Sequence, residues 1–215
     1  MAEQEHKTHN PILIPLFEAL RGERVVVCPY REEDAQALQE AVEESREHIR
    51  PWLPFSYQHQ NVEESLIWIK EQHAQWILRK NMNCGIFEAA TDRFLGGAGL
   101  MVRNWDIPYL EIGYWLRASV EGKGYMSEAV SLLTNYALEE LGAKRVEIRC
   151  DELNTRSANV ARRLGYVQEA LLHNNFLAPD GRVRNTLIFA ITDDGPQTTE
   201  DHLTSSVVGR PSSQT

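Results

Sequence analysis

Hydrophobic and polar positions along the chain follow two periods, and each period predicts one kind of element. Short apolar runs rich in β-branched and aromatic residues predict strands, while apolar residues at helical spacing, with charges on the other faces, predict amphipathic helices. The expected strands are residues 24–30, 83–90, 94–102, 109–117, 143–151, 166–176 and 182–192, and the expected helices are residues 31–49, 62–80, 123–141 and 155–164.

Local signals mark several of these boundaries. Two prolines in the segment RPWLPFS (50–56) prevent the first helix from continuing. Asn61, with Glu64 three residues later, resembles a capping box and predicts the start of the second helix. Gly142 and Gly165 stand where a glycine commonly follows the last residue of a helix.

The order of the elements predicts an α/β (α+β) protein built on one mixed sheet. The three middle strands are joined by short turns and should be antiparallel, whereas the β–α–β segment over 109–151 requires a parallel pair with a right-handed crossover. We therefore expect a mostly antiparallel sheet of about six to seven strands, with about four helices on its two faces. One domain should cover residues 22–192, after a lead over 1–21 and before a tail over 193–215, whose Pro-, Gly- and Ser-rich composition is typical of disorder.

Composition and charge exclude several classes of function. The 215 residues carry 22 lysines and arginines against 31 aspartates and glutamates, and a net charge of −9 argues against nucleic acid as a partner. The chain has no apolar stretch of membrane-spanning length, and its polar first ten residues do not resemble a signal peptide, so we expect no membrane contact and a cytoplasmic protein. The three cysteines and seven histidines are scattered without metal-ligand spacing, which predicts free buried thiols and no metal.

The segment EGKGYMSEA (121–129) predicts an anion site. It joins a strand to the first turn of a helix, where the amides have no internal partners and the helix dipole favours negative charge. Gly122 and Gly124 would let a diphosphate lie against the main chain, with the charge of Lys123 nearby. The alternative is a plain tight turn. A Walker A loop and a dinucleotide fingerprint are both excluded, the second because position 127 is serine.

Three ordered motifs resemble one enzyme superfamily. The segments EIGYWL, EGKGYMSEAVSLLTNYAL and ELNTRSANVARRLGY, together with REEDA and RPWLPF, resemble the GNAT acetyltransferases, in particular the RimJ/RimL-type N-acetyltransferase branch. The resemblance covers roughly residues 22–192. It implies the GNAT fold, acetyl-CoA as donor, and transfer of the acetyl group to a primary amine in a ternary complex.

The resemblance also implies a donor site. Residues 121–127, called the corner below, match the pyrophosphate loop of the family. Glu121 stands where glutamine or arginine is usual, and Met126 stands where glycine or alanine is usual. The strand end before the corner matches the splayed backbone that pairs with pantetheine, and two asparagines match positions that contact pantetheine near the sulfur. These candidates are Leu116, Arg117, Glu121, Gly122, Lys123, Gly124, Tyr125, Met126, Ser127, Asn154 and Asn159.

Amine attack on a thioester needs a base for the amine and a proton for the thiolate. Glu111 is the candidate base, since it lies on the strand before the corner and matches a glutamate that some family members use; the alternative is an exposed or ion-paired strand residue. By alternation it shares a face with Trp115, opposite Tyr114 and Leu116. The tyrosine that many family members use as acid is replaced by Ala161, and Ser157 matches the serine of the RimL-type branch. Its alternative is a residue that bonds its own helix backbone.

The acceptor side is less specific. Trp52 and Phe55, held between prolines, are expected to wall the acceptor cleft, and core packing is the alternative. The leading acceptor is a protein N-terminal amine, as in ribosomal-protein modification, and the alternative is a small amine such as an antibiotic, a polyamine or an aminoacyl nucleotide. Two non-enzyme alternatives remain open, namely an acyl-CoA-binding module and a nucleotide-binding or scaffolding domain. A homodimer also remains open.

Overall fold

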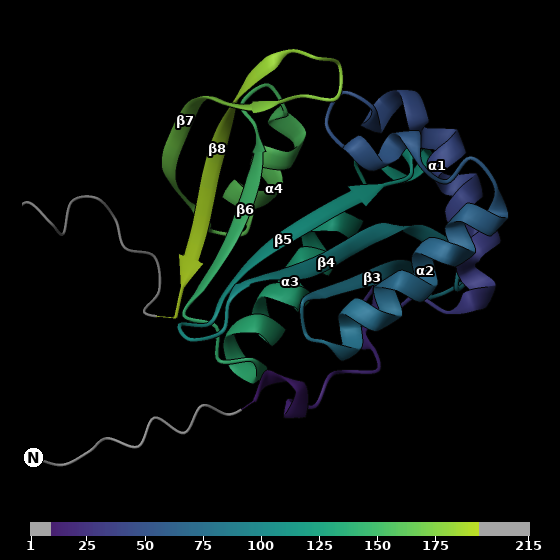
Figure 1. The fold of residues 1–215 in the computed structure, drawn as a ribbon, viewed down its shortest axis with the longest axis horizontal. Helices are drawn as coiled ribbons and strands as arrows, with labels where there is room; N and C mark the ends of the chain where they lie inside the picture. Colours follow the sequence, from purple (N-terminus) through teal and green to yellow (C-terminus); the bar gives the residue numbers. More distant parts are fainter. Residues whose placement is uncertain (1–9, 194–215) are drawn as a thin grey trace, which may run out of the picture.

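The computed structural model of the protein describes residues 10–193, so residues 1–9 of the expected lead and 194–215 of the expected tail lie outside the described residues. Its centre is one eight-stranded sheet (Figure 1). The strands are β1 (Leu20–Arg21), β2 (Val25–Pro29), β3 (Asn81–Glu88), β4 (Phe94–Asn104), β5 (Tyr109–Leu116), β6 (Arg145–Asp151), β7 (Val167–Leu177) and β8 (Val183–Thr192). The helices are α1 (Ala35–Ile49), α2 (Val62–Ile77), α3 (Tyr125–Asn135) and α4 (Thr155–Arg163), and a π-helical turn over Tyr136–Glu140 continues α3.

The sheet has the order β1-β2-β3-β4-β5-β6-β8-β7 and confirms the expected fold class. Every neighbouring pair is antiparallel except β5 and β6, which are parallel as the β–α–β segment required. The strand count is eight rather than six to seven. The extra strand, β1, has only two residues, and Leu20 and Arg21 pair with Val27 and Val26 inside the segment expected to be a lead.

The parallel pair is short. Its register runs only from Tyr109 opposite Arg145 to Glu111 opposite Glu147. Beyond this point β5 continues to Leu116 and the two strands diverge, with β6, β8 and β7 turning away from the rest of the sheet (Figure 1). The point where β5 and β6 part is where the site described below is built.

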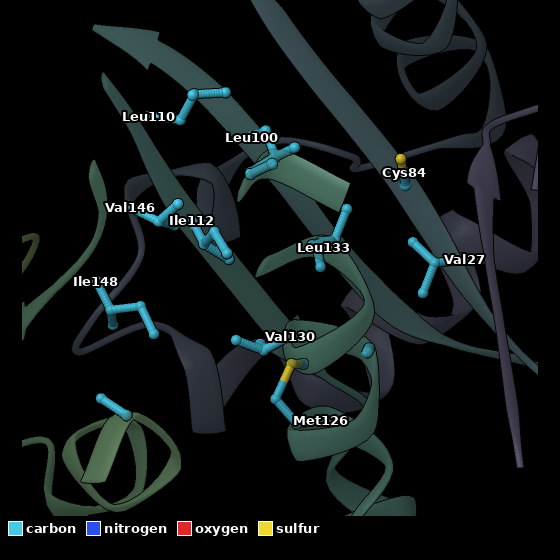
Figure 2. Close-up of a cluster of buried hydrophobic side chains, with 14 of the residues drawn as sticks. Val27, Cys84, Leu100, Leu110, Ile112, Met126, Val130, Leu133, Val146 and Ile148 are labelled. Carbon is cyan, nitrogen blue, oxygen red and sulfur yellow. The ribbon is translucent and has the colours of Figure 1, made fainter. Parts of the chain in front are cut away.

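Helices cover both faces of the sheet. The α3-side core joins α3 and α4 to the strands, and Figure 2 shows its side chains from α3 directed at β4, β5 and β6. The α1–α2 core lies on the opposite face. Representative buried members are Val27, Leu100, Ile112, Val130 and Leu133 on the α3 side. On the other face they are Leu38, Val42, Ile69, Phe87 and Phe94.

Two expected helices are shorter than their patterns because single residues take left-handed backbone conformations. The second helix ends at Ile77 rather than at residue 80, and Arg79 has φ +55°. The third begins at Tyr125 rather than at residue 123, because Gly124 has φ +83°. No helix between residues 10 and 193 has the length and apolar character needed to cross a membrane.

Candidate active site

The corner before α3 is shaped by two glycines. Gly122 and Gly124 have φ of +75° and +83°, a region that residues with side chains rarely adopt. Gly124 precedes α3, and no side chain among residues 10–193 caps this helix, whereas Asn61 and Asn154 cap α2 and α4 by accepting bonds from backbone amides. The first amides of α3 are thus left to a ligand or solvent, which is the arrangement expected for an anion site.

Contacts with the start of β2 fix this corner. The Arg24 guanidinium donates from Nη1 to the Lys123 carbonyl at 2.8 Å and from Nε to Glu128 at 2.8 Å. Glu128, in the first turn of α3, also accepts from the Arg24 amide at 2.8 Å. Burial alone would raise the pKa of Glu128, but the hydrogen bonds from Arg24 outweigh it and lower the pKa. The carboxylate therefore anchors α3 to the sheet in its charged form.

Glu121 does not point freely into the corner. Its Oε1 lies 2.5 Å from Nε2 of His48 in the last turn of α1, and its Oε2 lies 3.0 Å from Nη1 of Arg156 in the first turn of α4. The residue that departs from the family's usual glutamine or arginine therefore has two cationic or hydrogen-bonding partners from distant parts of the chain.

The remaining corner residues offer mainly their backbone. The Tyr125 hydroxyl donates to Glu88 at 2.6 Å, and the Met126 side chain is buried in the α3-side core (Figure 2). The hydroxyl of Ser127 accepts a bond from Arg163 at 2.9 Å. Methionine in place of glycine or alanine at position 126 thus directs its side chain away from the ligand side.

The last residues of β5 present an unpaired backbone edge toward the diverging β6. The Arg117 amide donates to Leu95 on β4 at 2.8 Å, and successive residues of a strand face opposite sides, so Tyr114 and Leu116 direct their amides and carbonyls away from β4. No described residue of β6 pairs with them, because the parallel register ends at Glu111. An extended ligand could add to this edge as a strand does. The Arg117 side chain is held instead by Glu44 of α1, at 3.0 Å.

Ser157 lies on the α3 side of this opening. Its hydroxyl is 3.0 Å from the Tyr114 hydroxyl, which also donates to the Ser157 carbonyl at 3.1 Å. Burial raises the pKa of Tyr114 despite the bond to Ser157, so the phenol stays protonated at neutral pH. Asn154 uses its side-chain oxygen to cap α4 through the Ser157 amide, and the exposed Asn159 accepts from Arg162 at 3.4 Å.

Glu111 sits at the last paired position of β5 and β6, on the α1–α2 face. Its carboxylate accepts from Arg103 at 2.9 Å and lies 3.5 Å from Nε of Arg149. Arg149 also binds Glu147, at 2.8 Å. Burial would raise the pKa of Glu147, but hydrogen bonds from Tyr109, Arg149 and Arg145 together lower it. Glu111 is therefore ion-paired in the structure, and its role as a base stays a prediction.

The acceptor candidates lie between α1 and α2. The Phe55 ring packs 5.5 Å from that of Trp115, on the same face as Glu111, and Trp52 is half-buried in the turn after α1. The hydroxyl of Tyr57 donates to the Pro179 carbonyl at 3.4 Å, so this connection contacts the turn between β7 and β8.

The structure brings the corner and the first turn of α4 together but places the candidate base and acid on opposite faces of β5. Alternation predicted that Glu111 and Tyr114 lie on opposite faces of β5, but it could not place Ser157, which belongs to α4. Five contacting residues were missed, because each comes from an element distant in sequence and has no local motif. They are His48, Arg103, Tyr114, Arg149 and Arg156.

Burial disfavours the reactive thiolate form of the three cysteines. Cys84 and Cys150 are buried, Cys28 is half-buried, and all three are free thiols whose pKa burial raises. Among residues 10–193 no group of three or more His, Cys, Asp or Glu side chains is arranged to hold a metal ion.

Comparison with known proteins identifies the family. Residues 24–167 match the family described as acetyltransferase (GNAT) domain. The chain belongs to the GNAT acetyltransferase family. This confirms the resemblance inferred from the motifs and makes the protein a member of a family of acyltransferase enzymes.

Relatives of this GNAT protein include ribosomal-protein acetyltransferases. The chain is 28% identical over 158 residues to the probable N-acetyltransferase YjcK of Bacillus subtilis (strain 168), covering 73% of this chain and 87% of the relative. It is 25% identical over 178 residues to the ribosomal protein uS5-alanine N-acetyltransferase of Escherichia coli (strain K12), covering 80% and 90%. The structure of RimL, the ribosomal L7/L12 alpha-N-protein acetyltransferase, in complex with coenzyme A has the same fold, with a TM-score of 0.76 at 20% identity over 82% of this chain and 99% of that one.

Proposed function

We propose that the protein transfers an acetyl group from acetyl-CoA to a primary amine, and that the acceptor is the N-terminal α-amine of a protein. The observation that carries the proposal is the uncapped glycine corner at the end of the open backbone edge of β5. One part suits a diphosphate and the other suits an extended chain, and coenzyme A contains both in that order.

In this proposal the amides of residues 122–127 bind the diphosphate of the donor. The pantetheine arm, which is extended and carries amide groups, adds to the backbone of Tyr114 and Leu116 as a short strand. Asn154 and Asn159 lie beside its sulfur end. The thioester then reaches the point where β5 and β6 part, between the two faces of the sheet.

The reaction crosses this point from one face to the other. The amine enters on the α1–α2 face, where Glu111 takes its proton directly or through a water, and its nitrogen forms a bond to the acetyl carbon. The carbon–sulfur bond breaks, and Ser157 on the α3 side gives a proton to the leaving thiolate and regains one from solvent. Arg103 and Arg149 hold the Glu111 carboxylate in place before the amine arrives.

A polypeptide acceptor is supported by the surroundings of the amine entrance. Trp52 and Phe55 belong to the connection between α1 and α2, which meets the β7–β8 turn at Tyr57 and Pro179. Such a bounded entrance suits a chain end better than the middle of a chain. Family relatives named for acetylation of ribosomal proteins point the same way.

The test is a turnover screen. The full-length protein is incubated with acetyl-CoA and either short peptides with free N-termini, the same peptides with blocked N-termini and one internal lysine, or small amines, and free thiol is measured. We expect thiol release only with free N-termini. Release only with small amines would contradict the acceptor class, and coenzyme A binding without any release would support the non-catalytic alternative.

A further inference from the structure

Glu121 connects three elements around the mouth of the donor site. Its carboxylate contacts His48 of α1 at 2.5 Å and Arg156 of α4 at 3.0 Å, and it directly precedes Gly122 of the corner. Nη1 of Arg156 also lies 2.9 Å from Nε2 of His48. The corner follows β5 and α4 follows β6, and these strands have parted at this level. The Arg156 side chain therefore spans the opening between the two strand ends, which is the path that an extended donor would take.

The contact between Glu121 and Arg156 is easily opened. The Arg156 side chain is 69% exposed and that of Glu121 is 30% exposed. Exposed ion pairs of this kind are weak, worth at most about a fivefold factor in an equilibrium. A guanidinium binds phosphate oxygens through two parallel bonds, and a diphosphate offers more charge and more acceptors than one carboxylate.

We propose that Arg156 is a donor-binding residue, that Glu121 holds its guanidinium in the free protein, and that the diphosphate of coenzyme A displaces this carboxylate. The inference rests on the proposed donor site and extends it to a side chain that the sequence motifs did not single out. In the exchange the guanidinium also leaves His48, while His48 keeps its contact with Glu121, so that the released carboxylate stays directed toward α1 and away from the ligand.

The proposal separates two effects of Glu121 that a single substitution confuses. If the carboxylate only competes for Arg156, Glu121→Gln tightens coenzyme A binding by freeing the guanidinium, and the gain needs Arg156. If instead the carboxylate repels the diphosphate directly, the gain is independent of Arg156. A double-mutant cycle measures this difference.

The experiment is calorimetric titration of coenzyme A into wild type, R156Q, E121Q and the double variant at low salt, with thermal melts to confirm folding. We expect R156Q to weaken binding by about tenfold, as loss of a charged hydrogen bond does. E121Q should tighten binding by about threefold in the wild-type background, a factor below the fivefold limit of an exposed pair, and by nothing in R156Q.

The control is Lys70→Gln, which removes one exposed positive charge, paired with Glu32 at 2.5 Å on the outside of α2. It should leave the affinity unchanged. The proposal is overturned by an equal gain from E121Q in both backgrounds, by no gain or a loss in wild type, by unchanged affinity in R156Q, or by an equal loss in K70Q. A folded wild type that does not bind coenzyme A would instead contradict the proposed function.

Discussion

The corner before α3 and the charged cluster where β5 and β6 last pair are built in opposite ways. The corner consists of backbone, because Gly122 and Gly124 turn the chain and leave the first amides of α3 uncapped. The charged cluster consists of side chains on neighbouring strands, whose carboxylates and guanidiniums fix one another. Its members are Arg103, Tyr109, Glu111, Arg145, Glu147 and Arg149.

This difference decides which substitutions each region tolerates. At the corner, Met126 turns into the core and Glu121 finds partners on α1 and α4, so two departures from the family pattern leave the amides available. In the charged cluster each group supports another, and removing one leaves a buried or half-buried partner without its counter-charge. The corner should therefore be disrupted by substitutions that change the backbone conformation or add bulk, and the charged cluster by substitutions that remove a charge.

The largest expected effect is on the rate, through Glu111→Gln. If this carboxylate takes the amine proton, kcat falls by about 100- to 10,000-fold with little change in coenzyme A affinity. The loss should shrink at high pH, where more of the amine is already neutral. Thiol release measured across pH, with calorimetry for coenzyme A, checks both parts.

Glu169→Gln is the matched control, since Glu169 pairs with Arg145 at the exposed side of the same cluster. It should leave kcat unchanged. Should Glu111→Gln keep near-normal turnover while its melting temperature drops, the carboxylate would be structural, and the amine would lose its proton to solvent.

The next largest effect is on donor binding, through Gly124→Val. A Cβ here would lie 3.1 Å from Nη1 of Arg24, so valine would displace the guanidinium that holds the corner, and loss of two charged hydrogen bonds to the diphosphate corresponds to about a 100-fold weaker affinity. The backbone conformation at φ +83° also disfavours valine, which lowers the free energy of unfolding independently of any ligand.

Gly142→Val separates the two causes. Gly142 follows the π-helical continuation of α3 with φ +65°, and a Cβ there would meet nothing within 4 Å. This variant carries the same backbone strain without a contact with Arg24, so it should lose stability yet bind coenzyme A normally by calorimetry. Equal coenzyme A affinity in folded Gly124→Val and wild type would contradict the proposal that the diphosphate binds at this corner.

The same contrast explains what the sequence could predict. The sequence predicted the glycine turn between a strand and a helix because its glycines, the strand before them and the helix after them are adjacent in the chain. The partners of Glu111 were not predicted, because Arg103 lies on β4 and Arg149 on β6, and their contacts depend on strand register, which periodicity does not determine. β1 was missed because two residues carry no readable alternation.

The faces on which candidate residues lie along a strand were predicted better than the contacts of their side chains. Alternation correctly put Glu111 and Trp115 on one face and Tyr114 on the other. It could not predict that the Tyr114 hydroxyl meets Ser157, because that contact joins β5 to a helix whose distance from the strand is set by the packing of the α3-side core.

The smallest expected effect concerns that contact. The Tyr114 hydroxyl donates a hydrogen bond either to the Ser157 carbonyl or to the Ser157 hydroxyl, and so orients the serine that is proposed to protonate the thiolate. Tyr114→Phe keeps the ring and removes this bond, which should lower kcat about fivefold, the value of one neutral hydrogen bond, with KM for acetyl-CoA unchanged. Because the effect acts through the serine, Tyr114→Phe should cause no further loss in a Ser157→Ala background.

Tyr166→Phe is the matched control, since Tyr166 makes an equivalent buried bond to Thr134 at 2.6 Å, outside the site. It should cost similar stability without changing kcat. Equal kcat losses in the two phenylalanine variants, or additive losses with Ser157→Ala, would make Tyr114 a packing residue only.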